Sequence, residues 1–308
     1  MIEVKFRKPN FRAKVREKTR PEASPVFRLF YADDSPSARE RLDWLGFEIL
    51  DLKAYDFQDW LDKATIAKTA ALTGYPEARK TGRSYEFDSD IWGQLKEHLQ
   101  ELFQGRCAYC EAWFQSVSFG DVEHYRPKAG VADDPNHPGY YWLAYDPENY
   151  LPACSQCNTK GKKNFFSIKG TRVLDPDAAL EVEDPLLFNP YRDRHCDHVA
   201  YVPTIYTNHP KLVAGMAVER TDRGERSIKC YGLNRDPLVR ERVRAQKSAV
   251  LRLKEALFNR NKPGLAEILR DCLCGKEEFC TAAATEIDAY YKEMGLGAPF
   301  PPEIKLGI

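Results

Sequence analysis

The sequence lacks any long apolar run and any secretory leader pattern. No stretch of 18 apolar residues is present, which excludes a membrane-spanning helix. The first twenty residues are basic, but no apolar run follows them, so they do not read as a secretory signal. These two absences predict a cytoplasmic protein that makes no membrane contact.

The chain also lacks an excess of charge of either sign. Its 46 Lys and Arg are balanced by 46 Asp and Glu. A stand-alone DNA-binding protein usually carries a basic excess, because its affinity comes largely from phosphate contacts. Positive charge is local here, in the first twenty residues and in the short run Lys160, Lys162 and Lys163. If the chain acts on nucleic acid, we expect a partner to supply part of the binding.

The N-terminal part is expected to be an extended arm followed by helices. The first thirty residues are basic and contain three prolines, which favours an arm that orders against another surface. Apolar residues recur near helical spacing from Ser35 to about Ala71, and a polar stretch follows over residues 73–87. Asp88 or Ser89 then caps a helix that Gly105 ends. The apolar residues on one face of this helix are Ile91, Leu95, Leu99 and Leu102.

The C-terminal part is expected to be mostly helical. Residues 171–233 are Pro-rich and irregular, with strands predicted near Val199–Tyr206. Asp236 as N-cap and Pro237 at the first helical position are typical of a helix start. The side chains predicted to point inward from this helix are Val239, Val243, Val250, Leu253 and Leu257. Two more helices are predicted at roughly 264–273 and 276–292, and they offer a surface for a partner or for a second copy in a homodimer.

Four cysteines form two CxxC pairs, Cys107 with Cys110 and Cys154 with Cys157, separated by 43 residues. Two CxxC turns can complete a tetrahedral site of four sulfurs around one Zn²⁺. Four unrelated buried thiols are one alternative. A redox pair is another, but neither pair lies in the βαβ pattern of a thioredoxin-like protein. In a reducing compartment, clustered cysteines bind metal more often than they pair. We therefore expect a structural zinc ion, since protein fills all four positions.

The segment between the two pairs contains residues suited to phosphodiester hydrolysis. His124 is a suitable base, because the pKa of histidine lies near neutral pH. Glu123 lies beside it and offers carboxylate oxygens, the ligands that Mg²⁺ or Mn²⁺ prefers. Asn149 and Asn158 follow, the second directly after the last cysteine. Each has a structural alternative: His124 as a core residue, Asn149 in a turn and Asn158 as a helix cap.

The order CxxC, Glu-His, Asn, CxxC-Asn resembles that of HNH endonucleases, which have a ββα-metal fold. The resemblance implies that Glu123 and Asn158 hold a catalytic Mg²⁺ or Mn²⁺ and that His124 is the general base. Asn149 would orient the loop that carries His124. The family more often has Asp directly before the His, so Asp121 remains an alternative ligand to Glu123.

Longer strings between about 95 and 245 are similar to the HNH effectors of Septu-type and retron-associated anti-phage defence systems. These strings are EHYRPK (123–128), GYYWLAYDPENYLPACSQCNTKGKKN (139–164), LLFNPYRDRH (186–195) and YGLNRDPLVRERV (231–243). The likeness implies a nuclease controlled by a partner ATPase of the ABC or SMC type. DNA is favoured over RNA as substrate. The alternative is a non-catalytic zinc module that binds nucleic acid or serves as a scaffold in such a complex.

The basic residues near these motifs are candidates for contacts to nucleic acid. They are Arg126, Lys128, Lys160, Lys162 and Lys163. Simple exposure to solvent is the alternative for each of them.

The patterns together predict an α+β fold, with mainly helical flanks around a small zinc-containing ββα-metal core. Residues 1–90 would form the basic arm and a helical N-terminal region. Residues 91–170 would form the nuclease core. Residues 171–308 would form the mostly helical C-terminal region.

Overall fold

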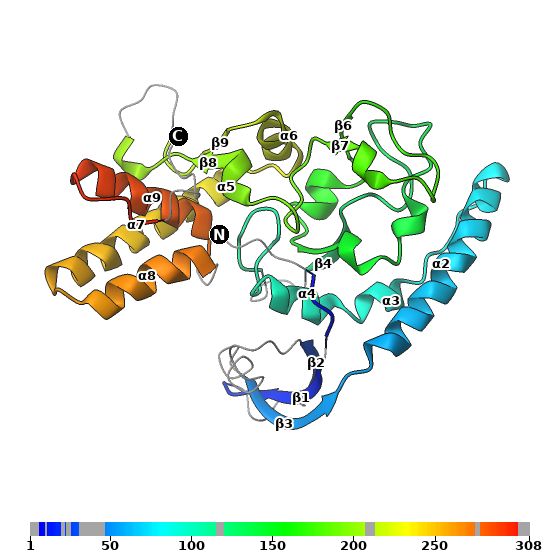
Figure 1. The fold of residues 1–308 in the computed structure, drawn as a ribbon, viewed down its shortest axis with the longest axis horizontal. Helices are drawn as coiled ribbons and strands as arrows, with labels where there is room; N and C mark the ends of the chain where they lie inside the picture. Colours follow the sequence, from blue (N-terminus) through cyan, green and yellow to red (C-terminus); the bar gives the residue numbers. More distant parts are fainter. Residues whose placement is uncertain are drawn as a thin grey trace.

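The computed structural model describes residues 6–9, 11–19, 22, 26–30, 47–114, 120–206, 213–274 and 278–300. Short two-stranded sheets and loops occupy the middle of the molecule, with the long helix α2 (Phe57–Lys80) at one side and the C-terminal helices at the other (Figure 1). This mixture of helices and small sheets is compatible with the predicted α+β class. None of the described helices has the length and apolar content needed to cross a membrane.

A three-stranded antiparallel sheet occupies the N-terminal part. Its order is β2 (Val26–Phe30), β1 (Phe11–Glu17), β3 (Phe47–Ala54). The predicted arm is therefore wrong for β1 and β2, and the predicted helix is wrong for β3; residues 35–46 lie outside the described residues. Without Leu50, the segment 47–54 alternates strictly between apolar and polar residues, as a strand does. Leu50 is the extra residue of a β-bulge, because Lys14 pairs with Asp51 and Val15 with Ile49.

Helix α2 continues beyond the predicted end near Ala71. Asp56 caps its start by accepting a hydrogen bond from the Gln58 backbone amide at 2.9 Å. The helix contains Pro76 near its end, where tertiary contacts hold the last turns in place. The Tyr75 hydroxyl donates to the Pro138 carbonyl at 2.6 Å, and the Tyr75 ring stacks on Tyr141 at 5.0 Å. These contacts fasten α2 to the central loops.

The helix predicted from Asp88 is present as two short helices, α3 (Ser89–Gly93) and α4 (Lys96–Leu102). Asp88 caps α3 as predicted, and its carboxylate accepts from the Asp90 amide at 3.0 Å. Between the two helices the Leu95 amide donates to the Trp92 carbonyl, a hydrogen bond of the 3₁₀ type, which turns the chain. The predicted apolar face is confirmed, since its four members are all buried. Gly105, at φ 74°, ends the segment just before Cys107.

The central part contains two short antiparallel pairs. β4 (Asp121–His124) pairs with β5 (Tyr150–Ala153), and β6 (Ile168–Lys169) pairs with β7 (Asp184–Pro185). One turn of π-helix follows β5 over Asn158–Lys162. The predicted ββα order is thus present, with its helical part reduced to this single turn.

The C-terminal part is mostly helical. The short helix α5 (His195–His198) leads into β8 (Val199–Tyr201), which pairs with β9 (Ala217–Glu219), and α6 (Asp222–Cys230) follows. The three remaining helices pack on one another. They are α7 (Asp236–Phe258), α8 (Lys262–Cys274) and α9 (Cys280–Glu293). The last two confirm the helices predicted near 264–273 and 276–292.

The inward face of α7 differs from the predicted one by about one residue. Of the side chains predicted to point inward, only Leu253 is fully buried. The buried positions are Leu238, Arg242, Gln246, Ala249, Leu253 and Ala256. Two polar residues occupy this face, and each donates to a backbone carbonyl of another segment. Arg242 donates to the Leu233 carbonyl at 2.6 Å, and Gln246 donates to the Val202 carbonyl at 3.0 Å.

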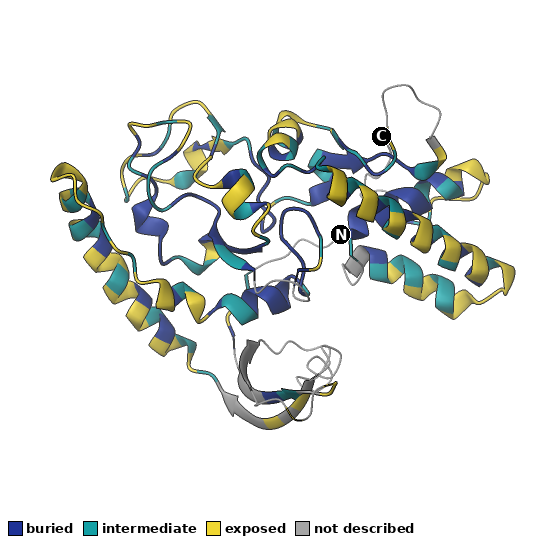
Figure 2. Ribbon diagram, turned by 180° about the vertical axis from the view of Figure 1, so that it is seen from behind, coloured by how far each residue is buried: buried dark blue, intermediate teal, exposed yellow. Residues whose placement is uncertain are grey.

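Buried residues gather in the central loops, whereas α2 and the C-terminal helices expose their outer faces (Figure 2). A large apolar core extends from α2 to the central hairpin, and a smaller one lies among the C-terminal helices. Glu111 joins the two parts. Its buried carboxylate accepts from the Thr281 amide at 3.0 Å and from the Thr281 hydroxyl at 2.5 Å, at the start of α9. Arg106 donates to the neighbouring Cys280 sulfur at 3.0 Å.

Replacing Glu111 by Gln is expected to lower the free energy of unfolding by about 2 kcal/mol, since a hydrogen bond to a charged acceptor contributes about 1.5–3 kcal/mol. Burial raises the pKa of Glu111, but the charges of His195 and Arg106 and the bonds from Thr281 leave it below its ordinary value, so the group is ionised. Urea unfolding measures the change. The exposed Glu293 at the end of α9 provides the control, and Glu293→Gln should change stability by less than about 0.5 kcal/mol. Equal effects in the two variants would contradict the anchoring role of Glu111.

Candidate metal centre and catalytic site

The four predicted zinc ligands lie together. Cys107 and Cys110 belong to a turn that follows α4, and Cys154 and Cys157 follow β5. All four sulfur atoms lie within 4.8 Å of one another, and the sulfurs of Cys110 and Cys154 are 3.9 Å apart. Tetrahedral zinc with Zn–S bonds of about 2.3 Å would place its sulfurs about 3.8 Å apart. The cluster therefore fits a metal ion such as zinc.

The surroundings of the cluster act on its thiols in both directions. Hydrogen bonding from Cys107 lowers the pKa of Cys110 and of Cys154. Burial raises the pKa of Cys107, and hydrogen bonding with the other three cysteines raises that of Cys157. The Arg235 guanidinium lies 3.6 Å from the sulfur of Cys157 and 3.6 Å from that of Cys110. Burial opposes the charge of Arg235, but the neighbouring thiols raise its pKa above the ordinary value. Thiolate is the form that binds metal, and a buried cation offsets part of the charge of four sulfurs.

The candidate catalytic residues Asp121, Glu123 and His124 lie along strand β4 of the β4–β5 hairpin. In its register Asp121 lies opposite Ala153, next to the cysteine cluster, and His124 lies opposite Tyr150. Side chains alternate between the two faces of a strand. Asp121 and Glu123 therefore share one face of β4, and the side chain of His124 lies on the other.

His124 is held from several sides. Its Nε2 lies 3.0 Å from the Ala144 carbonyl, and its ring meets those of Trp92 and Tyr150 edge-on at 5.0 and 5.1 Å. A carbonyl only accepts, so Nε2 carries the proton and Nδ1 carries the lone pair. Burial, with the charge of Lys128, lowers the pKa of His124 to about 3, well below the near-neutral value expected from the sequence. At neutral pH the ring is therefore uncharged, and among the described residues none bonds its Nδ1.

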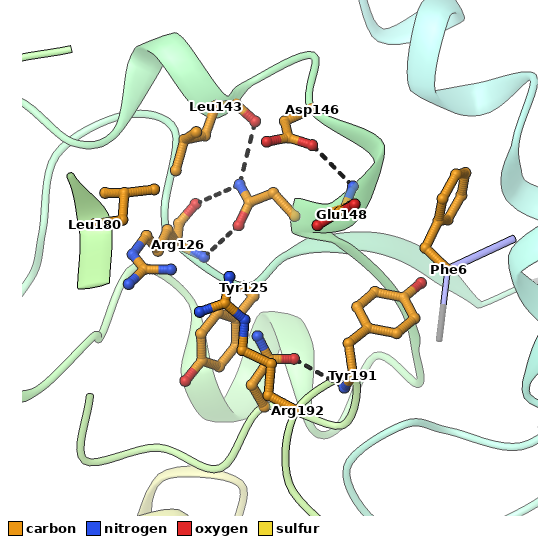
Figure 3. A pocket seen from close by; sticks show the side chains of 11 residues that line it. Phe6, Tyr125, Arg126, Leu143, Asp146, Glu148, Leu180, Tyr191 and Arg192 are labelled. Atoms are coloured by element: carbon orange, nitrogen blue, oxygen red, sulfur yellow. Dashed lines mark hydrogen bonds between the residues drawn. The ribbon is translucent and has the colours of Figure 1, made fainter. Parts of the chain in front are cut away.

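Asn149 fixes the backbone just beyond His124. Its side-chain oxygen accepts from the Arg126 amide at 2.8 Å, and its nitrogen donates to the carbonyls of Arg126 at 3.0 Å and Leu143 at 3.2 Å (Figure 3). The side chain therefore bonds both backbone groups of Arg126 and spans two successive peptide units. Asn149 has a structural role in this loop, and its role in orienting His124 stays a prediction.

Glu123 and Lys162 form a buried ion pair. Lys162 is fully buried, and its Nζ lies 2.5 Å from Glu123 Oε1 and 3.0 Å from the His124 carbonyl oxygen. Burial raises the pKa of Glu123, and the charge of Lys162 acts against that rise. The predicted contact between Lys162 and nucleic acid is not what the structure shows. An ammonium buried against a carboxylate is not available at the surface, and leaving that carboxylate unpaired would cost several kcal/mol.

Asn158 lies on the same face of the hairpin but meets Asp121. Its side-chain nitrogen donates to Asp121 Oδ2 at 3.2 Å, and both residues are partly exposed. Asp121, Glu123 and Asn158 thus offer carboxylate and amide oxygens, a donor set that suits Mg²⁺. Within the described ranges, the four cysteines are the only group of three or more His, Cys, Asp or Glu side chains that gather as metal ligands do.

The chain is similar to a protein named Septu protein PtuB from Bacillus mycoides (strain KBAB4), with 33% identity over 169 residues. The alignment covers 53% of this chain and 54% of the relative, so the chain spans about half the length of the curated relative it matches. No protein-family model matches the chain. No solved structure matches it significantly. The similarity supports the narrower of the two resemblances, the one to Septu-type proteins.

The remaining predicted basic residues lie in different surroundings. Arg126 is buried, pairs with Glu183 at 3.1 Å and lies 5.3 Å from the centre of the Phe166 ring. Its predicted contact with phosphate is therefore not what the structure shows, because an internal carboxylate and aromatic rings already enclose it. Lys128 is partly exposed, with Nζ 4.9 Å from the centre of the Trp92 ring. Lys160 and Lys163 are exposed, as a surface role requires.

A pocket of about 320 Å³ opens on the other side of the loop that Asn149 fixes (Figure 3). Arg126 and Arg192 line it together with Asp146 and Glu148, so its charges are mixed. The adjoining pocket of about 240 Å³ is also balanced, since Arg223 in its wall pairs with Asp193 at 2.9 Å. Neither pocket presents a surplus of one charge to a ligand.

Proposed function

We propose that this chain is a metal-dependent HNH-type endonuclease that hydrolyses phosphodiester bonds in nucleic acid, with DNA favoured over RNA. The observation that carries the proposal is the way His124 is held. The Ala144 carbonyl accepts a hydrogen bond from its Nε2, and Asn149 bonds the backbone of Arg126 two residues later. This arrangement leaves Nδ1 as an oriented acceptor at the end of a hairpin whose other end is joined to the cysteine cluster. The buried His137 also bonds a carbonyl through Nε2, but its Nδ1 accepts from a backbone amide.

In the proposed mechanism, Nδ1 of His124 accepts the proton of the attacking water. The Ala144 carbonyl keeps the ring in the tautomer that this step needs. Asn149 keeps the loop at a constant distance from the hairpin. Lys162 favours the ionised form of Glu123 and orients it. Asn158, with Glu123 or Asp121, would hold Mg²⁺ or Mn²⁺, which would supply charge stabilisation to the phosphate and the leaving oxygen. These ligands and the His124 side chain lie on opposite faces of β4, so the phosphate would lie at the end of the strand, where His124 is the last residue.

The similarity to Septu protein PtuB supports a place for this chain in an anti-phage defence system. We propose that an ABC- or SMC-like ATPase controls the nuclease there. The balanced charge of the chain fits this arrangement, because a partner would supply part of the affinity for nucleic acid. The division into regions 1–90, 91–170 and 171–308 and a homodimer remain predictions of the sequence.

The proposal predicts cleavage that depends on a divalent ion. The purified chain, alone and with its co-encoded ATPase, is incubated with supercoiled plasmid, single-stranded DNA and tRNA in Mg²⁺, in Mn²⁺ and in EDTA. We expect cut products with either ion and none in EDTA, which removes the charge stabilisation of the leaving oxygen. The EDTA incubation is kept short, and zinc content is checked afterwards, so that loss of the cysteine-bound ion is not mistaken for loss of the catalytic one. Intact substrates under all conditions, with the ATPase present, would contradict the proposed activity.

A non-catalytic zinc module that binds nucleic acid or serves as a scaffold is the second candidate. The burial of the two central residues favours it. Glu123 and His124 are each only 5% exposed, and Lys162 and Ala144 occupy one polar atom of each. This candidate predicts binding in the same assays without any cut product.

A further inference from the structure

A cavity of about 470 Å³ lies between the π-helical turn Asn158–Lys162 and the C-terminal end of α6. The two elements approach closely because residue 161 is glycine. A Cβ at this position would lie 3.0 Å from the carbonyl oxygens of Cys230 and Gln156. Lys160 belongs to the same turn as Asn158 and lines the cavity.

In the part of the chain that the structure describes, the wall of the cavity contains several cations and no acidic residue. Lys160, Arg226, Lys229 and Arg235 contribute to its wall, and none of the eleven described residues around it is acidic. Arg235 is committed to the cysteine sulfurs, so its charge is largely offset. Lys229 has an exposed partner, Glu225 at 2.5 Å, and such surface pairs contribute little free energy. Lys160 and Arg226 are exposed and give the cavity a surplus of positive charge in a chain whose net charge is zero.

An aromatic ring lies beside these cations. Phe165 lines the same cavity and is 44% exposed, so its ring is accessible to a ligand held by the cations. Cations that follow a phosphate backbone, with an aromatic face on which a base can stack, are the combination that proteins use to hold a single nucleic-acid strand. Free phosphate would need only the cations.

We propose that this cavity binds one strand of the nucleic-acid substrate, with backbone phosphates at Lys160, Arg226 and Lys229 and a base against Phe165. The inference rests on the proposed function and adds to it a path for the substrate. Lys160 lies two residues from Asn158, so a strand held in the cavity passes next to the candidate ligands of the catalytic ion. The strand would be unpaired here, because a paired base cannot lie flat on the ring.

The test measures binding without cleavage. Fluorescence anisotropy of a labelled oligothymidylate is followed in EDTA at several salt concentrations, with the double variant K160A/R226A, the variant Phe165→Ala and the matched control K68A/K247A, which removes two exposed lysines elsewhere. We expect K160A/R226A to raise Kd about tenfold or more and to lower the slope of log Kd against log salt by about 1.4. Phe165→Ala should raise Kd about fivefold or more at an unchanged salt slope, since it removes stacking and no charge. The control should match the parent, and all variants should retain their zinc and their melting temperature.

Three results would overturn the inference: a parent chain that does not bind the oligonucleotide, unchanged binding by K160A/R226A, or an equal loss in K68A/K247A. Displacement of the oligonucleotide by inorganic phosphate or ADP at comparable concentrations would also overturn it and would assign the cavity to a small phosphate ligand. Because the assay contains no divalent ion, it separates this inference from the proposed activity. A parent that cleaves while K160A/R226A binds normally contradicts only the inference. A parent that binds through the cavity but never cleaves contradicts only the nuclease proposal.

Discussion

Replacing Cys154 by serine is expected to release the bound zinc and to disorder the β4–β5 hairpin. Cys154 follows β5 directly, and its sulfur lies 3.9 Å from that of Cys110. A neutral hydroxyl does not replace a thiolate ligand of zinc. Structural zinc sites have apparent binding free energies of about 10–16 kcal/mol in small zinc fingers, and that free energy contributes to folding. Most of it would be lost for the segment between the two CxxC turns.

This loss should appear in three measurements. Metal analysis should fall from about one zinc per chain to near zero. Thermal unfolding should begin at a lower temperature, and hydrogen exchange should accelerate in β4 and β5.

Cys230→Ser is the matched control for Cys154→Ser. Cys230 is a free, partly buried thiol at the end of α6 and is not one of the four clustered cysteines. Its replacement should leave the zinc content unchanged and lower the melting temperature by only a few degrees, because it removes one partly buried contact. If Cys154→Ser retained one zinc per chain and the exchange pattern of the parent, the four cysteines could not be a zinc site.

The cysteine cluster and the Asp88 cap could be predicted from the sequence because their physical causes are local, whereas the cap predicted at Asp236 is wrong, since α7 begins at Asp236 and its N-cap is Arg235. A CxxC turn brings two sulfurs together whatever surrounds it, and only the meeting of the two turns is a tertiary event. Asp88 caps α3 through an amide two residues away. In the same way, the apolar face over α3 and α4 follows from spacing along a few turns.

The errors arose where distant residues decide the structure. Residues 47–54 contain apolar residues at both helical and strand spacing, and pairing with β1, more than thirty residues earlier, selects the strand. One extra residue at Leu50 hides the alternation that would have indicated it. On α7, Arg242 and Gln246 replace predicted apolar neighbours because carbonyls from other segments are available to them.

In the candidate site, too, the sequence indicates residues that are adjacent but not the partners that the fold brings to them. Glu123 and His124 are found by their adjacency, but the partner of Glu123 is Lys162, 39 positions later. A charge run such as 160–163 gives no sign that one of its lysines is fully buried while its neighbour is exposed. Arg235 lies 78 residues beyond Cys157, and its position after a glycine-containing turn gives no indication of contact with sulfur. Such pairings depend on the fold and are not visible in local spacing.

Replacing His124 by alanine is expected to lower the rate of plasmid nicking by about 10²- to 10⁴-fold, the usual contribution of a positioned general base. The variant removes Nδ1 of His124, an acceptor next to the Asn149 loop that no described residue bonds. It does not touch the cysteine cluster, so its zinc content should equal that of the parent. Initial rates with Mg²⁺ measure the effect, with the ATPase present if the parent requires it.

His137→Ala separates this chemical effect from the loss of a buried ring. His137 is also buried in the central loops and also bonds to a carbonyl through Nε2, that of Val173 at 2.9 Å, and its Nδ1 already accepts from the Gly139 amide. His137→Ala removes the same side-chain volume and a similar hydrogen bond, so we expect the two variants to be destabilised to a comparable extent. It removes no nitrogen that could accept a proton from water, so the nicking rate should stay within about threefold of the parent. Equal nicking rates in His124→Ala and the parent would remove the base from the mechanism. Equal losses in the two histidine variants would instead attribute the effect to packing, because the two side chains differ in whether Nδ1 is left available to a water molecule.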